Sequence, residues 1–182
     1  MRVIAGILGG RRLVAPRGLA TRPTTDRVRE ALFSALGPID GARVLDLYAG
    51  TGALGIESLS RGAASAIFVE SARPAIAALR ENLATLDLTA RSRVIADPVD
   101  RAARRLAEDP SLAFDLVFAD PPYDDVDDAL SALETLAPVL APEARVILEH
   151  ASRRPPRPSP TFTTVRTRTY GDTSLAFLSP ST

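Results

Sequence analysis

The stretch Val44-Leu45-Asp46-Leu47-Tyr48-Ala49-Gly50-Thr51-Gly52-Ala53-Leu54-Gly55 decides the fold of this 182-residue chain. It begins as an apolar run typical of a buried strand and continues into glycines spaced G-x-G-x-x-G before a helix-like segment. Glu70 ends the next predicted strand, 20 residues after Gly50. Glycines let the backbone turn sharply and approach a ligand, and an acid at this spacing can bind ribose hydroxyls. The stretch predicts a nucleoside-containing cofactor at the carboxyl ends of parallel strands.

Around this stretch, strand-like and helix-like segments alternate. Strands are predicted at 44–48, 66–70, 92–96, 114–119 and 144–149, and helices at 53–61, 74–86, 99–108 and 126–140. Such alternation favours a parallel sheet covered by helices on both faces. Two further strands, 162–169 and 174–178, flank a turn and predict an antiparallel hairpin. We expect an α/β fold with a Rossmann-like doubly wound, mostly parallel seven-stranded sheet and a C-terminal antiparallel hairpin.

The N-terminal region predicts a small β-hairpin extension. Strand-like residues 2–8 and 11–15 flank Gly9-Gly10, and glycine supplies the positive φ of a two-residue turn. A helix is predicted from Thr24-Thr25-Asp26 to Gly37-Pro38. The expected division is a basic hairpin extension at 1–23 and a cofactor-binding domain at 24–182.

Composition narrows the functional classes. The absence of cysteine excludes disulfides, thiolate zinc sites and cysteine nucleophiles. No apolar run approaches ~20 residues, and the first residues do not resemble a signal peptide. These features lead us to expect a cytoplasmic protein that does not interact with membranes.

The net charge of zero conceals a segregated pattern. All 22 cationic side chains are arginine. Residues 1–30 hold seven arginines against two acids, and residues 151–182 hold five against one, whereas residues 31–150 hold ten against 19. A GC-rich genome explains arginine in place of lysine but does not explain the segregation. Basic ends on an acidic body indicate a polyanionic partner.

A second motif, Asp120-Pro121-Pro122-Tyr123, follows the predicted strand 114–119. Two prolines stop the strand and stiffen its exit, because neither has an N–H to donate and both have a fixed φ. The corner presents a carboxylate, backbone carbonyls and an aromatic ring, which together could hold a flat base by its exocyclic amine. A plain strand stop with an acid in it is the alternative interpretation.

Two cofactors, NAD and S-adenosylmethionine, suit the glycine loop. Asp46, in the strand before the loop, suits a cationic amino acid better than a pyrophosphate. The chain has no lysine, and its single histidine, His150, is poorly placed for hydride chemistry. In a doubly wound sheet the first and fourth strands are neighbours, so the loop and the Asp120 corner should share one crevice. These features favour S-adenosylmethionine.

The glycine loop followed by Asp-Pro-Pro-Tyr resembles the class I S-adenosylmethionine-dependent amino-methyltransferases. The segment Arg22-Pro23-Thr24-Thr25-Asp26-Arg27-Val28-Arg29-Glu30 resembles, more narrowly, the bacterial 16S ribosomal RNA guanine-N2 methyltransferase family. The similarity covers nearly the whole chain; the Pro- and Arg-rich connector at 153–160 is its least familiar part.

The resemblance implies roles for individual residues. Asp120 and the Pro121 carbonyl would accept the two N2 hydrogens of a flipped guanine, and Tyr123 would stack on the base. Gly50 and Gly52 would approach the cofactor, while Glu70 would bind its ribose, Asp97 its adenine amine and Asp46 its methionine end. For Asp46 a cap on the glycine loop, and for Asp97 a helix cap, remain alternatives.

The implied partner is 16S ribosomal RNA, within an assembling small subunit. The candidate phosphate contacts are Arg11, Arg12, Arg22, Arg27 and Arg29, although any single arginine is more simply a solvated surface charge. The acids at 124–128 fit a helix N-terminus better than a metal site, so no metal is expected.

Three other functions remain open from the sequence. A DNA adenine-N6 methyltransferase could use the same corner, but no separate target-recognition domain is evident. An NAD-dependent oxidoreductase could use the same glycine spacing. A non-catalytic RNA-binding protein would have no reason to keep the complete corner.

Overall fold

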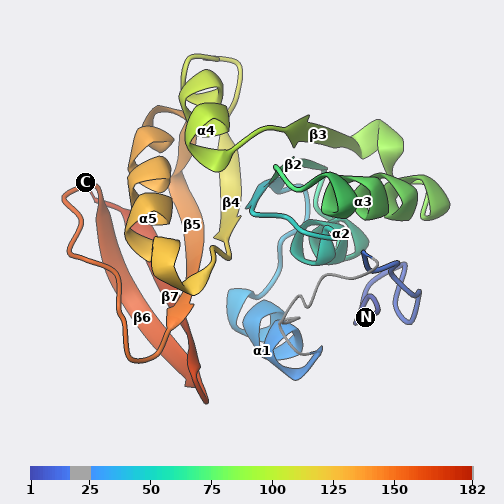
Figure 1. The fold of residues 1–182 in the computed structure, drawn as a ribbon, viewed down its shortest axis with the longest axis horizontal. Coiled ribbons are helices and arrows are strands. Elements are labelled where there is room, and N and C mark those ends of the chain that lie inside the picture. The colour runs from blue at the N-terminus through green and yellow to red at the C-terminus, as the bar shows by residue number, and fades with distance from the viewer. Residues whose placement is uncertain (17–25, 182) are drawn as a thin grey trace.

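The computed structural model describes residues 1–16 and 26–181, apart from the side chain of Tyr123. Its centre is a seven-stranded sheet in the order β3-β2-β1-β4-β5-β7-β6 (Figure 1). The strands are β1 (Arg43–Leu47), β2 (Ser65–Glu70), β3 (Ser92–Ala96), β4 (Phe114–Ala119), β5 (Leu140–Ala151), β6 (Phe162–Tyr170) and β7 (Thr173–Pro180). Strands β1 to β5 pair in parallel, whereas β7 pairs antiparallel with both β5 and β6. The predicted fold class is confirmed.

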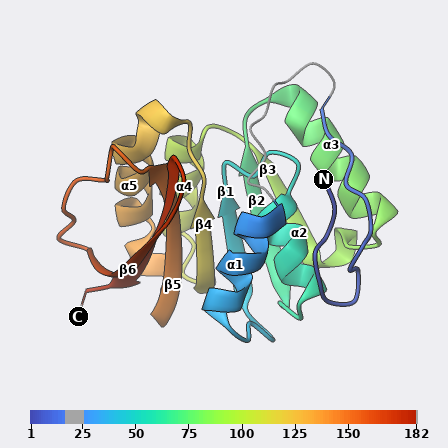
Figure 2. The same cartoon turned by 90° about the horizontal axis from the view of Figure 1, so that it is seen from below.

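Helices cover both faces of the sheet. They are α1 (Asp26–Leu36), α2 (Ala53–Ser60), α3 (Arg73–Thr85), α4 (Val99–Ala107) and α5 (Val126–Thr135), with short 3-10 turns η1 (Thr89–Arg91), η2 (Tyr123–Asp125) and η3 (Ala137–Val139). Buried residues of α1, α2 and α3 share one core with one set of strand side chains, and those of α4 and α5 share the other core. Figure 2 shows α1 and α2 in front of the strands. Both strand faces are therefore apolar, as the sequence predicts.

One predicted helix ends early. The pattern predicts a helix over 126–140, but α5 ends at Thr135 and η3 follows. Pro138 lies in η3, and a proline inside a helix removes a hydrogen bond and clashes with the preceding turn. Strand β5 then begins at Leu140, earlier than predicted, and shifts register against β4 between Phe114 and Leu116.

The N-terminal hairpin is smaller than predicted. Within residues 1–16 the antiparallel pairing is a single bridge between Arg2 and Arg12, so the strands are shorter than predicted. Gly9-Gly10 does form a turn, in which the Arg11 N–H donates to the Leu8 carbonyl at 3.1 Å and Gly10 has φ +85°, but this turn lies inside a longer loop and does not join the paired residues directly. The intervening chain turns toward α2 instead, where both oxygens of the buried Glu57 accept backbone N–H groups, from Ile4 at 2.6 Å and Ala5 at 3.0 Å. A buried carboxylate needs such donors, and these contacts hold the segment on α2. The division into 1–23 and 24–182 stays a prediction.

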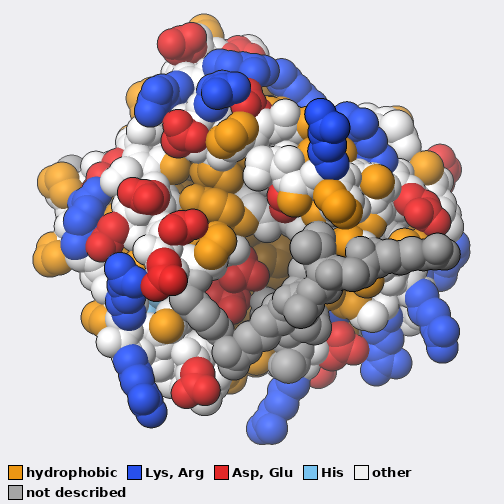
Figure 3. Space-filling model, viewed as in Figure 1, with side chains coloured by type: hydrophobic (Ala, Val, Ile, Leu, Met, Phe, Trp, Pro, Cys, Tyr) orange, Lys and Arg blue, Asp and Glu red, His pale blue; other side chains and the backbone are white. Residues whose placement is uncertain are grey.

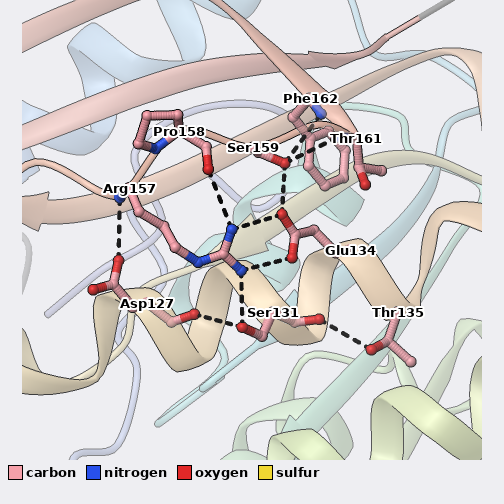
Figure 4. Close-up of polar contacts among 9 residues, drawn as sticks. All are labelled: Asp127, Ser131, Glu134, Thr135, Arg157, Pro158, Ser159, Thr161 and Phe162. Atoms are coloured by element: carbon pink, nitrogen blue, oxygen red, sulfur yellow. Dashed lines mark hydrogen bonds and ion pairs between the residues drawn. The ribbon is translucent and has the colours of Figure 1, made fainter.

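The connector before β6 lies along α5 (Figure 4). The guanidinium of Arg157 donates to both carboxylate oxygens of Glu134, at 3.0 and 2.7 Å, and to the hydroxyl of Ser131. Ser159 also donates to Glu134, at 2.7 Å. Arg157 thus makes a structural contact that holds the Pro- and Arg-rich connector against α5.

Among the described residues, no helix has the length and apolar character needed to cross a membrane.

Candidate active site

The sheet brings the two sequence motifs together. Strands β1 and β4 are paired neighbours, with Leu47 opposite Ala119, so the glycine loop and the Asp120 corner leave the sheet side by side. A cavity of about 1170 Å³ opens between them and extends over the first turns of α4 and along α5 as far as Thr135. Figure 3 shows acidic side chains, in red, around the hollow at the centre of this face. The predicted crevice at the switch point is therefore present.

The three glycines of the loop have different structural roles. Gly50 lines the cavity with φ +56°, and a Cβ there would meet no atom within 4 Å. Gly52 and Gly55 are buried, and a Cβ would lie 2.4 Å from Leu79 and 2.3 Å from Phe68, respectively. Gly50 thus leaves room for a ligand. Gly52, predicted to contact the cofactor, does not line the cavity and serves packing between the loop, α3 and β2.

Asp46 is buried at the floor of the cavity. Its carboxyl accepts the Gly55 N–H at 2.9 Å, so the alternative role as a cap on the glycine loop is present in the structure. Burial raises the pKa of Asp46 to about 8; the Gly55 bond opposes this rise, and the charges of Asp120 and Glu70 add to it. A cation in the cavity would relieve this repulsion, because an opposite charge favours the ionised carboxylate.

Glu70 lies where the sequence predicts, at the end of β2 and in the cavity wall. One carboxylate oxygen accepts the Gly50 N–H at 2.8 Å, and the other accepts the N–H groups of Ser71 and Ala72, each at 2.8 Å. These bonds fix the carboxylate between the glycine loop and the start of α3. Carboxylate oxygens have further lone pairs, so Glu70 can still accept from ribose hydroxyls.

Asp97 lies directly after β3, as the sequence predicts, but its contacts are with α4. It is nearly buried, but its carboxylate pairs with Arg105 at 2.9 Å and Arg101 at 3.2 Å, both on α4, and it does not line the cavity. Its neighbours Pro98, Val99 and Asp100 line the cavity instead. Asp97 thus anchors α4 through two ion pairs, a structural role similar to the alternative role of a helix cap.

The corner after β4 reaches the cavity with Asp120, Pro121 and Pro122. Pro121 is buried and Pro122 is exposed. The chain is rigid where it leaves β4, because each proline has a fixed φ. Glu149, at the end of β5, lines the same part of the cavity. The backbone of Tyr123 opens η2, but its side chain lies outside the described residues, so its predicted stacking role stays a prediction.

Tyr48 is a cavity residue that sequence reasoning missed. It has φ +59°, which is unusual for a residue with a side chain, and lies in the wall between the glycine loop and α4 and α5. Burial raises its pKa to about 12, with further contributions from Asp125, Asp128 and Asp100. Its position directly after the Asp46 strand was a signal, because strand ends at a switch point face the ligand.

The predicted RNA-binding arginines separate into three groups. Arg11, Arg12 and Arg27 are exposed, as a phosphate contact requires, and Arg22 lies outside the described residues. Arg29 corrects the prediction: its side chain is fully buried in the first turns of α1, so it offers no surface contact, and it lines the cavity instead. Helical spacing turns residue 29 toward the sheet while residue 27 faces outward.

No three His, Asp or Glu side chains gather in a way that could hold a metal ion within residues 1–16 and 26–181. His150 is buried and its Nδ1 contacts the Ala151 carbonyl at 2.8 Å, so it takes no part in the cavity.

Comparisons with known proteins agree with this geometry. The chain is 42% identical to "Putative rRNA methyltransferase YlbH" of Bacillus subtilis over 97% of both chains. It is 44% identical to "Ribosomal RNA small subunit methyltransferase D" of Escherichia coli, over 68% of this chain and 60% of that protein. The solved structure "Putative methyltransferase yhhF from Escherichia coli" superposes with a TM-score of 0.83 and 33% identity, covering 100% of this chain and 98% of that one.

These relatives confirm the predicted resemblance to methyltransferases. A more distant solved structure, "Crystal structure of SMU.776, a putative methyltransferase complexed with SAH", is 15% identical to this chain, and SAH is the demethylated product of the predicted cofactor, S-adenosylmethionine. The cavity fits S-adenosylmethionine: among the described residues, seven acidic side chains line it against two arginines, which suits a cationic sulfonium, and Gly50 leaves room beside the loop. The family described as "Conserved hypothetical protein 95" matches residues 1–179, and the chain belongs to that family.

Proposed function

We propose that this protein transfers a methyl group from S-adenosylmethionine to the exocyclic N2 of a guanine in 16S ribosomal RNA, in the cytoplasm during assembly of the small subunit. The observation that carries the proposal is the shared cavity: the Asp120 corner and the glycine loop open into one space from neighbouring strands. The relatives' names, rRNA methyltransferase and small-subunit methyltransferase, support RNA as the substrate.

Catalysis in this proposal depends mainly on positioning. S-adenosylmethionine supplies a methyl group on a sulfonium that is already activated for transfer. The Asp120 carboxylate and the Pro121 carbonyl accept the two N2 hydrogens, which turns the nitrogen lone pair toward the methyl group. The amine proton leaves to solvent after transfer, so Asp120 need not act as a base.

The target base must leave its stack to enter the cavity. Unstacking costs a few kcal/mol and is least costly in a single-stranded or loop region of RNA. Tyr123, at the rim of the corner, is proposed to stack on the extruded base and offset part of this cost. The acids around Asp120, including Glu149, suit a base that presents amine hydrogens.

The test is methyl transfer from labelled S-adenosylmethionine to small subunits and to naked 16S RNA, both from a strain lacking the gene. Mass spectrometry identifies the modified base. We expect N2-methylguanosine, and we expect Asp120→Asn to slow transfer by about two orders of magnitude while cofactor affinity is unchanged. The matched control is Asp124→Asn, because Asp124 lies four residues further along, is 95% exposed and does not line the cavity.

Adenine is the competing target, because its exocyclic amine would satisfy the same acceptors. Formation of N6-methyladenine in DNA, with none of the label in ribosomal RNA, would replace the proposed substrate. Normal turnover by Asp120→Asn would refute the role of the corner.

A further inference from the structure

Arg29 is the buried cation that the site described above leaves unexplained. Its side chain has 0% relative exposure. Nη2 donates to the Arg2 carbonyl at 2.6 Å and to the Asp26 carboxylate at 2.8 Å. Nε and Nη1 are buried with no hydrogen-bond partner in the described residues. One end of the guanidinium is therefore clamped, and the remaining donors are left unsatisfied.

Such an arrangement is costly unless a ligand completes it. Arginine keeps its charge in proteins, and buried donors on a charged group lose hydration that a single ion pair does not replace. The clamp from Arg2 and Asp26 prevents the side chain from swinging out to water. These conditions are those of a pre-organised anion site, because the donors are fixed before the anion arrives.

The position of Arg29 indicates which anion. Arg29, Met1 and Thr51 line the cavity together, and the Thr51 hydroxyl contacts the Met1 sulfur at 3.8 Å. Arg29 thus faces the cavity where the N-terminal segment meets the glycine loop. It lies in the first turns of α1, whose amino end adds positive potential. Arg104, which also lies in the wall, is 71% exposed and pairs with Asp100.

The charges of the cavity match a zwitterion. Its lining is acidic and includes Glu70, fixed beside the loop, and Asp46, whose ionised form a cationic ligand would favour, whereas Arg29 supplies one buried positive charge. The methionyl part of S-adenosylmethionine has two cationic groups, the sulfonium and the ammonium, and one carboxylate. We propose that Arg29 binds this carboxylate through Nε and Nη1. The inference depends on the cofactor and is independent of which base is methylated.

Binding of cofactor analogues tests this role without any turnover. Isothermal titration calorimetry compares S-adenosylmethionine with its decarboxylated form, which keeps the sulfonium and the amine. We expect the wild-type protein to prefer the carboxylated ligand by about 10- to 100-fold, the range for charge-assisted hydrogen bonds. Arg29→Met should abolish this preference and leave affinity for the decarboxylated ligand within about threefold. Arg27→Met, an exposed change on the same helix, should retain the full preference.

Each outcome decides the proposal. Arg29→Lys keeps a cation and should retain part of the preference for the carboxylated ligand. Thermal unfolding shows whether Arg29→Met folds, and Arg29→Lys takes its place in the comparison if it does not. A wild-type preference near one, or a preference unchanged in both Arg29 variants, overturns the assignment. Weaker binding of 16S RNA by Arg29→Met, with the ligand preference intact, assigns Arg29 to an RNA phosphate and also overturns it. If the wild-type protein binds neither ligand, the cofactor itself is refuted.

Discussion

At the scale of single residues, Asp46 combines a structural bond with the charge of the cavity. The bond to the Gly55 N–H holds the start of α2 against β1, and the same carboxyl faces the space where a cation is expected. Burial and the nearby charges of Asp120 and Glu70 make its ionised form unfavourable unless a cation lies beside it. Ionised Asp46 therefore lowers the stability of the protein without a bound cation and increases its affinity for a cationic ligand.

The raised pKa of Asp46 predicts that the stability of the protein depends on pH. With a folded pKa of about 8 against 3.8 for the free side chain, the folded state holds a proton on Asp46 between these values and the unfolded chain does not. The unfolding free energy of the ligand-free protein should fall as pH rises through this window, by up to about 1.4 kcal/mol per pH unit. Asp46→Asn lacks this proton, so its stability relative to wild type should increase from pH 5 to pH 8 in urea unfolding.

A matched carboxylate provides the control. Asp115 pairs with Arg43 at 2.9 Å, which lowers the pKa of Asp115, so this group stays ionised above pH 5 in both states. The stability difference between Asp115→Asn and wild type should therefore be constant over the same range. A constant difference for Asp46→Asn as well would mean that Asp46 is ionised throughout.

At the scale of elements, the end of α3 shows how a local cap sets a boundary. The Leu88 N–H donates to the Leu83 carbonyl at 2.8 Å and the Asp87 N–H to the Ala84 carbonyl at 3.2 Å, which is the Schellman pattern. That pattern needs a left-handed residue, and Asp87 has φ +55°. Gly37 has φ +71° in the corresponding position after α1, and glycine adopts this conformation without strain because it has no Cβ.

Asp87→Gly should stabilise the protein. Glycine adopts the left-handed conformation without the strain of a side chain, and the change also removes a negative charge from a helix C-terminus. We expect the unfolding free energy to rise by about 1 kcal/mol in urea titrations. Asp87→Asn removes the charge but keeps the side chain, so it should gain less; an equal gain would attribute the effect to charge and not to backbone strain.

The same scale shows what the sequence could predict. The presence and type of the parallel strands follow from their short apolar runs bounded by turn residues. Their boundaries are less exact, since β5 begins at Leu140 and not at residue 144. The N-terminal hairpin has shorter strands and a longer loop than predicted, for a physical reason. A turn motif carries no information on Glu57, whose buried carboxylate attracts the backbone N–H groups of Ile4 and Ala5.

In the candidate site, too, some residues could be predicted from the sequence and others could not. Asp46, Gly50, Glu70 and Asp120 were predictable because strand ends and a tight turn place them at one edge of the sheet whatever their side chains contact. The role of Asp97 depends on Arg101 and Arg105, which lie one turn apart on α4 and capture its carboxylate. Pairing of this kind is decided by tertiary geometry, so spacing alone could not exclude it.

At the scale of the whole molecule, the segregated charge gains a spatial meaning. Residues 1–16 lie on α2 beside the cavity, which Met1 and Ala15 help to line, and their arginines face outward. By contrast, seven of the acidic residues that the structure describes line the cavity itself. We interpret this as a division in which exposed arginines attract the phosphate backbone and the acidic cavity receives a base.

This division predicts the effect of removing Arg11 and Arg12, both exposed, by substitution with Gln. Each phosphate contact to single-stranded RNA contributes about 0.7 to the slope of log affinity against log salt, so the double variant should lower that slope by up to about 1.4. Filter binding of 16S RNA at several salt concentrations measures the slope, and cofactor affinity should not change. Arg43→Gln with Arg93→Gln removes the same charge at the amino edge of the sheet, away from the cavity, and should leave the slope intact. Equal losses in the two double variants would mean that net charge, and not the N-terminal segment, governs RNA binding.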